Sequence, residues 1–238
     1  MNWSNEKILK IAMEQSAFDA NCSAEDFLCE KNVIAISKPS ENARKYLKLP
    51  HACNLISYGK NVVATISEEY REIVENYINR FAVEHCFETP NMHVLTALPC
   101  DFELNLLKPE DFANLYLPEW SNALCEKRKH LDILCVGAFD GQKLVGLAGC
   151  SADCDSMWQI GIDVLPEYRQ KGIASALTSR LAIETLERGK VPFYCCAWSN
   201  IKSARNAIKS GFRPAWVEMT VKPANEVNEM NKIIKNEE

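Results

Sequence analysis

The stretch from Val164 to Leu177, VLPEYRQKGIASAL, carries the residues of this chain best suited to hold an anion. An apolar strand pattern ends at Pro166 and a helical pattern begins after Gly172, so the N–H groups of the first helical turn meet between them. Gly172 permits close backbone approach, while Arg169 and Lys171 add positive charge. The spacing predicts a diphosphate site. An ordinary strand-to-helix turn with solvated basic side chains is the alternative.

A second stretch with a recognisable order of residue types runs from Trp198 to Phe212, WSNIKSARNAIKSGF. Asn200 stands before a helical pattern, in the position of an N-cap, and Gly211 stands where that helix should stop. Asn200 therefore either caps its helix or hydrogen-bonds a ligand, and the two roles are compatible.

Together the two stretches resemble the GNAT acyltransferase superfamily. The phosphate loop of that family has Arg or Gln, two variable residues, Gly, one variable residue, then Gly or Ala, and Arg169, Gly172 and Ala174 occupy those places. The second signature of the family is an Asn, a small residue three later and a Gly-Phe pair; its counterparts here are Asn200, Ser203, Gly211 and Phe212. The resemblance covers roughly residues 100 to 222 and leaves the first hundred outside it.

The resemblance implies an acetyl-CoA-dependent N-acetyltransferase in which a neutral amine attacks the thioester directly in a ternary complex. It implies a pantetheine arm held by backbone groups between two splayed parallel strands, a pyrophosphate held by the loop, and an oxyanion stabilised by a strand N–H near Val164. The predicted cofactor-binding residues are Ile162, Asp163, Val164, Arg169, Gln170, Lys171, Gly172, Ile173, Ala174, Asn200 and Ser203. Acetyl-CoA is the expected co-substrate, no metal is expected, and the expected acceptor is an amine of a small molecule or a peptide.

The sequence departs from the family where many members carry a Tyr that protonates the leaving thiolate, because Ala207 stands there. Gln159 stands where some relatives place a base, and a Gln cannot take up a proton. The candidates that could act through water are Asp153, Asp155 and Glu218, each of which could equally be a solvated carboxylate. We therefore assign no catalytic residue from the sequence.

Two other functions are weighed against acetyl transfer. The departures at Gln159 and Ala207 keep open a CoA-binding regulatory or structural module that has lost catalysis. A dinucleotide-binding domain is disfavoured, because no G-x-G-x-x-G motif follows an early strand.

The spacing of apolar residues along the chain predicts the strands and helices that position these residues. Together these elements predict a mixed α/β fold. Asp140-Gly141 joins the apolar runs 131–139 and 143–150 and predicts an antiparallel hairpin. The remaining elements expected after residue 98 are a strand at 102–106, a strand at 157–164, a helix at 172–188, a strand at 191–198, a helix at 201–209 and a strand at 215–221.

The first part of the chain predicts a smaller α/β section. Its expected elements are a helix after Ser4, a helix capped by Ser23 and Asp26, a strand at 32–37, a hairpin at 52–58 and 61–66, and a helix from Ser67 to Phe81. We expect this section at residues 1–97, a GNAT-like domain at 98–223 and a polar tail at 224–238. The first section is expected to cover an edge of the catalytic sheet or to help form the acceptor site.

Composition narrows the classes of partner. The 238 residues hold 27 basic and 32 acidic side chains, and the net charge of −5 argues against a nucleic-acid or anionic membrane surface. No apolar run is long enough to span a bilayer, and the start lacks a secretory signal, so a cytoplasmic protein is expected. The eleven cysteines form no C-x-x-C pair, which indicates reduced thiols rather than disulfides or zinc. A homodimer is left open.

Overall fold

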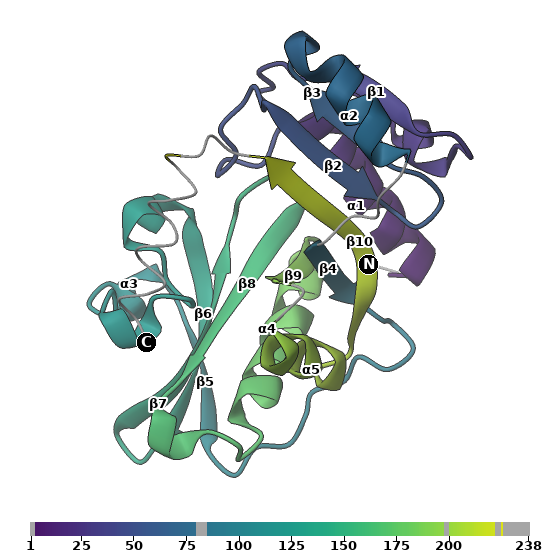
Figure 1. Cartoon of the computed structure of the whole chain (residues 1–238). Helices are drawn as coiled ribbons and strands as arrows, with labels where there is room; N and C mark the ends of the chain where they lie inside the picture. Colours follow the sequence, from purple (N-terminus) through teal and green to yellow (C-terminus); the bar gives the residue numbers. More distant parts are fainter. Residues whose placement is uncertain (1–2, 80–84, 198–199, 222–224, 226–238) are drawn as a thin grey trace.

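A single mixed sheet of ten strands runs through the molecule, with helices on both of its faces (Figure 1). The computed structural model describes residues 3–79, 85–197, 200–221 and 225. The order of the strands across the sheet is β1-β3-β2-β10-β4-β9-β8-β7-β6-β5. The mixed α/β fold predicted from the sequence is therefore confirmed.

The elements have the following bounds. The strands are β1 (Val33–Ile36), β2 (Cys53–Ser57), β3 (Val63–Ile66), β4 (His85–Pro90), β5 (Glu103–Leu107), β6 (Asp132–Asp140), β7 (Lys143–Ser151), β8 (Met157–Val164), β9 (Val191–Cys196) and β10 (Phe212–Val221). The α-helices are α1 (Asn5–Ala20), α2 (Arg71–Ile78), α3 (Pro109–Phe112), α4 (Ile173–Glu187) and α5 (Ile201–Lys209). The 3₁₀-helices are η1 (Ala24–Leu28), η2 (Glu68–Tyr70), η3 (Pro118–Trp120), η4 (Glu126–Leu131) and η5 (Pro166–Tyr168).

Most local signals in the sequence are realised as predicted. β6 and β7 form the hairpin, with Asp140 opposite Lys143 in the antiparallel ladder. The Ser4 side chain caps α1, and Ser23 caps η1. The helix predicted from Ser67 differs, because Ser67 makes no side-chain cap bond and α2 begins only after a turn of 3₁₀-helix.

β4 is the strand that the sequence did not predict. It lies between β9 and β10 and is antiparallel to both. β10 also pairs with β2, so strands from before and after residue 98 alternate within one sheet. The expected domain division at residue 98 thus falls between β4 and β5 of the same sheet. Phe81 and the tail 224–238, apart from Asn225, lie outside the described residues.

Two layers of helix bury the two faces of the sheet. α4 packs on one face, where Leu177 and Leu181 are fully buried against Ile160 and Tyr194. α1 packs on the opposite face, in a cluster that contains Phe193 and Trp216. Because side chains alternate along a strand, Phe193 and Tyr194 of β9 point to different layers.

A buried ionic cluster fastens α1 and the segment after β1 to β10. The Arg44 guanidinium donates to both the Asp19 carboxylate and Glu218 Oε1, the latter at 2.7 Å, and its side chain is 2% exposed. Trp216 Nε1 also donates to Glu218 Oε1, at 2.8 Å. Glu218, a sequence candidate for a water-mediated base, is therefore already held by two donors.

Removing the guanidinium should destabilise the fold strongly. We expect Arg44→Ala to lower the free energy of unfolding by about 3–5 kcal/mol, because Asp19 and Glu218 would remain as buried charges without a cationic partner. The free energy of unfolding is measured by urea denaturation of the wild type, of Arg44→Ala and of the control variant Lys10→Ala. The control breaks the exposed Lys10–Glu14 pair, which should be worth less than about 1 kcal/mol. Equal losses in the two variants would contradict the assigned role of Arg44.

Candidate functional site

The central feature of the site is a gap between β8 and β9. The two strands pair in parallel over four residues, from Met157↔Val191 to Ile160↔Tyr194. Among the described strands, β8 then pairs only with β7 as it continues to Val164. The sheet therefore opens beyond Ile160, as the sequence resemblance predicts for splayed parallel strands.

The ladder on the other side of β8 shows which backbone groups face this gap. The Leu165 N–H donates to Val145 O of β7 at 3.0 Å. Backbone N–H and C=O groups alternate in direction along a strand, so Asp163, two residues before Leu165, also directs its backbone groups at β7. Ile162 and Val164 consequently point theirs away from β7 and toward the gap. Arg169 Nε donates to Val164 O at 3.0 Å. The backbone of Ile162 can pair with an extended ligand that carries amide groups.

Asp163 makes different contacts from its neighbours Ile162 and Val164. Its backbone belongs to the ladder with β7, opposite Leu147. Its carboxylate accepts hydrogen bonds from the backbone N–H groups of Asn122 and Ala123, at 2.8 and 2.9 Å, and from Asn122 Nδ2 at 2.7 Å. Of the three predicted pantetheine-binding residues, Ile162 and Val164 face the gap, and Asp163 instead anchors the segment 121–125 over the sheet.

Two glycines let this segment lie directly on the strands. Gly149 and Gly161 are cross-strand partners in β7 and β8. A Cβ atom at Gly149 would overlap the carbonyl oxygen of Ala123, and one at Gly161 would overlap that of Asn122. This contact cannot be predicted from the sequence, because two glycines twelve positions apart form a pattern only after the strand register is known.

The loop after β8 has the backbone geometry of an anion site. Gln170 and Gly172 have φ angles of 64° and 81°, and α4 begins at Ile173. Within the described part of the chain, no backbone oxygen accepts from the N–H groups of residues 170–175. A Cβ at Gly172 would meet no heavy atom within 4 Å, so the space above the loop is open. These N–H groups and the positive end of α4 can bind a diphosphate.

The two basic side chains of the loop, Arg169 and Lys171, make different contacts. Arg169 is turned back toward Val164 O, as described above, whereas the Lys171 ammonium lies 4.9 Å from the centre of the Tyr168 ring. Both side chains are exposed. The site thus combines fixed backbone donors with two cations at its surface.

Asn200 and Ser203 stand at the start of α5. Asn200 Oδ1 accepts from the Ser203 N–H at 3.1 Å, so Asn200 caps the helix. Ser203 Oγ lies 2.8 Å from Tyr194 OH, which belongs to the last residue pair before the gap. Ala207, where the family often has Tyr, is fully buried in the cluster under α4 and α5.

A polar cavity of about 210 Å³ lies on the face of the sheet opposite α4, under the anchored segment. It contains Gln159 together with Ser121, Asn122, Ala123, Cys125, Arg128, Asp132, Gly149, Ser151 and Gly161. Burial raises the pKa of Asp132, and Arg128 Nη1 donates to Asp153 Oδ1 at 2.6 Å. Burial raises the pKa of Asp153 to about 6, although Arg128 opposes the shift. Asp132 and Arg128 therefore line this cavity, Asp153 is the buried ion-pair partner of Arg128 and is not part of the lining, and Asp155 is exposed.

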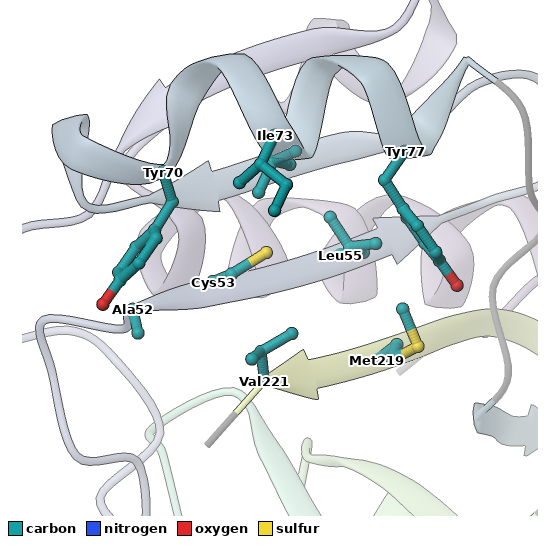
Figure 2. Close-up of a pocket in the computed structure, with 9 residues that line it drawn as sticks. Ala52, Cys53, Leu55, Tyr70, Ile73, Tyr77, Met219 and Val221 are labelled. Carbon is teal, nitrogen blue, oxygen red and sulfur yellow. The ribbon is translucent and has the colours of Figure 1, made fainter. Parts of the chain in front are cut away.

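A larger groove of about 600 Å³ lies away from the gap, between α2 and the strands β2 and β10 (Figure 2). Tyr70 of η2, with Ile73 and Tyr77 of α2, faces Leu55 and Met219 across it. Its lining is apolar apart from two phenol groups and the Cys53 thiol, and burial raises the pKa of that thiol to about 11. The described residues that line the groove include no carboxylate, imidazole or amine.

The described ranges contain neither a cluster of metal ligands nor a membrane-spanning helix. No three His, Cys, Asp or Glu side chains there lie close enough to hold a metal ion together. No helix there is long and apolar enough to cross a membrane.

Comparison with known proteins gives a match to the family described as GNAT acetyltransferase, over residues 20–215, so the match also covers most of the first hundred residues, which the sequence resemblance left outside. Among solved structures, the chain is similar to a GCN5-related N-acetyltransferase-like protein from Streptococcus suis, with 19% identity, a TM-score of 0.45 and coverage of 68% of this chain and 69% of the other. It is also similar to a GNAT-family acetyltransferase from Colwellia psychrerythraea, with 14% identity, a TM-score of 0.48 and coverage of 68% and 66%. No curated protein sequence matches the chain.

The anchoring role assigned to Asp163 can be tested by removing its carboxylate. We expect Asp163→Ala to lower the free energy of unfolding by about 1–3 kcal/mol, because three donors of Asn122 and Ala123 lose a charged acceptor. Hydrogen exchange should also speed up in residues 121–125. Asp155→Ala is the matched control, since that carboxylate is exposed. Unchanged exchange in Asp163→Ala would show that the segment is held by other contacts.

Proposed function

The chain belongs to the GNAT acetyltransferase family, and from that premise we propose that it transfers the acetyl group of acetyl-CoA to a primary amine. The acceptor is a small molecule or a peptide, and the amine attacks the thioester directly in a ternary complex. The observation that carries the proposal is the opening of the sheet beyond Ile160, with the loop Arg169–Ala174 at the end of the same strand.

Acetyl-CoA supplies an activated acetyl thioester. In our proposal its pantetheine arm lies in the gap and pairs with the backbone of Ile162, as an added strand would. Its pyrophosphate accepts hydrogen bonds from the N–H groups that follow Arg169, and Lys171 adds charge at the surface. The open space above Gly172 supports this placement.

The acceptor amine is proposed to enter the polar cavity on the other face of the sheet. Gln159, which lines that cavity, immediately precedes Ile160, where the strands part. The cavity therefore adjoins the place where the thioester would lie. Asp132 lines the cavity, and the charge of the Arg128 guanidinium in the same lining is balanced by its ion pair with Asp153, so an ionised Asp132 favours an acceptor that carries a positive charge.

A catalytically impaired CoA-binding module is the second candidate. Gln159 in the polar cavity and the buried Ala207 favour it, because neither side chain can transfer a proton. Both candidates require cofactor binding, and only one requires acetyl transfer.

Cofactor binding is tested at Gly172. Gly172→Glu should weaken acetyl-CoA binding at least about tenfold, because it places bulk and negative charge against the N–H groups of the loop. Titration calorimetry measures the affinity. Gly59→Glu is the matched control, since Gly59 also has a positive φ, 99°, and no heavy atom within 4 Å of an added Cβ.

Both substitutions force a side chain into the left-handed region, so both should cost similar stability, about 1–2 kcal/mol. The prediction requires only Gly172→Glu to lose affinity. Equal affinity in two folded variants would mean that the loop after β8 is an ordinary turn.

Acetyl transfer is tested by release of the CoA thiol in the presence of a panel of amines. We expect amine-dependent release, with a matching acetyl mass gain on the acceptor, and the highest rates for small cationic amines. Persistent inactivity with confirmed acetyl-CoA binding would favour the binding module instead.

A further inference from the structure

Most buried carboxylates of the described residues have an arginine beside them, as expected because an isolated charge is costly to bury. Glu88 and Asp132 are buried and form no ion pair with the residues that the structure describes. Glu88 lines neither of the two cavities described above, whereas Asp132 lines the polar one. The paired carboxylates are Asp19 and Glu218 with Arg44, Asp153 with Arg128, and Glu184 with Arg180 and Arg188.

Neutral donors hold the carboxylate of Asp132 in the wall of the polar cavity. Asp132 is the first residue of β6 and is 5% exposed. Its Oδ2 accepts from the Cys125 N–H at 2.9 Å, and the Tyr116 hydroxyl also donates to the carboxylate. These contacts fix the position of Asp132 without balancing its charge. A cation that enters the cavity would supply the missing partner.

Asp132 stands at one end of a row of polar side chains that crosses three strands. In the strand register it lies opposite Ser151 of β7, and Ser151 lies opposite Gln159 of β8. All three residues line the polar cavity. Gln159 adjoins Ile160, the last described residue of β8 that pairs with β9. The row therefore begins beside the gap and ends at a carboxylate.

The length of this row sets the length of the molecule that suits it. Neighbouring strands lie about 4.8 Å apart, so Asp132 lies about 10 Å from the backbone of β8. The cavity holds about 210 Å³, which is less than the usual site for a drug-sized ligand. A slender, unbranched acceptor therefore fits the cavity better than a bulky one.

The charges of the lining decide which group the far end of the acceptor should carry. Arg128 Nη1 donates to Asp153 Oδ1 at 2.6 Å, so an acceptor carboxylate would compete with Asp153 for this guanidinium. An acceptor ammonium meets no such competition at Asp132, because no described cation is paired with it. The lining thus favours a positive charge at the end of the row.

We propose that Asp132 is a specificity-determining residue that binds a second ammonium group of the acceptor, so that the preferred acceptor is an unbranched diamine. This assignment rests on the acetyl transfer proposed above. The reacting nitrogen lies beside Gln159 at the gap, and the second nitrogen lies at Asp132. The alkyl chain between them passes Ser151 beneath the segment 121–125.

Binding is tested by titration calorimetry in the full chain with CoA bound. The probe is octamethylenediamine, and its control is the amino alcohol of the same chain length, which replaces the second ammonium by a neutral hydroxyl. We expect the diamine to bind about 10- to 100-fold more tightly, because hydrogen bonds to charged groups are the stronger ones. Asp132→Asn should abolish this difference, since Asn keeps an acceptor oxygen for the Cys125 N–H but has no charge. Asp101→Asn, at an exposed aspartate, should preserve it.

The kinetic test compares kcat/KM for diamines of increasing length with kcat/KM for the amino alcohols of the same length. We expect the ratio to be highest when the two nitrogens lie about 10 Å apart. Asp132→Asn should lower this ratio about 10- to 100-fold. Asp132→Glu should keep a preference for diamines and move it to a shorter chain, because its carboxylate extends one methylene further. Urea denaturation confirms that each variant is folded.

The outcomes separate the two proposals. If no amine is acetylated and the diamine shows no binding that depends on Asp132, both proposals fail. If the diamine binds through Asp132 but no amine is acetylated, the proposed function fails and Asp132 remains a diamine site. If amines are acetylated and Asp132→Asn leaves the ratio of diamine to amino alcohol unchanged, only the role of Asp132 is overturned. An equal loss of rate for both acceptors belongs to that last case, because it indicates a structural role.

Discussion

The parallel ladder between β8 and β9 ends at Ile160↔Tyr194, and the rest of the site depends on that ending. Beyond it, Ile162 has backbone groups that face a gap instead of a strand, because the other groups of β8 are committed to β7. Backbone groups of this kind need a partner. The loop that follows β8 adds a second set of unpaired N–H groups only a few residues later, at 170–175. One strand thus presents two neighbouring sets of donors to one extended ligand.

The N-terminal section takes part in this arrangement by completing the sheet. β4 fills the place between β9 and β10, and β2 pairs with the far side of β10. The Arg44 cluster then fixes α1 and the segment after β1 to β10 through Asp19 and Glu218. Strands and helices from before residue 98 therefore set the position of β9, which forms one wall of the gap.

Local signals made much of this fold predictable. Asp140-Gly141 predicted a tight hairpin because its two residues suit the turn by themselves, and Gly172 predicted the start of α4 for the same reason. The loop Arg169–Ala174 could be recognised because its residues are contiguous.

Features that depend on distant pairing could not be predicted. β4 is identified only by its partners on both sides, and its residues His85–Pro90 show no clear alternation of apolar and polar types. The family resemblance predicts Asp163 as a cofactor residue together with Ile162 and Val164, whereas the direction of its backbone groups depends on the register with β7. In the same way, Cys196 of β9 donates a hydrogen bond to Glu88 of β4, although the two residues lie more than a hundred positions apart in the chain.

The central claim is that the gap beyond Ile160 receives the pantetheine arm, and a crystal structure with bound acetyl-CoA tests it most directly. The account predicts a pantetheine amide within hydrogen-bond distance of the Ile162 backbone and pyrophosphate oxygens at the N–H groups of residues 170–174. A cofactor bound elsewhere, such as in the apolar groove beside α2, with the gap beyond Ile160 empty, would contradict the account.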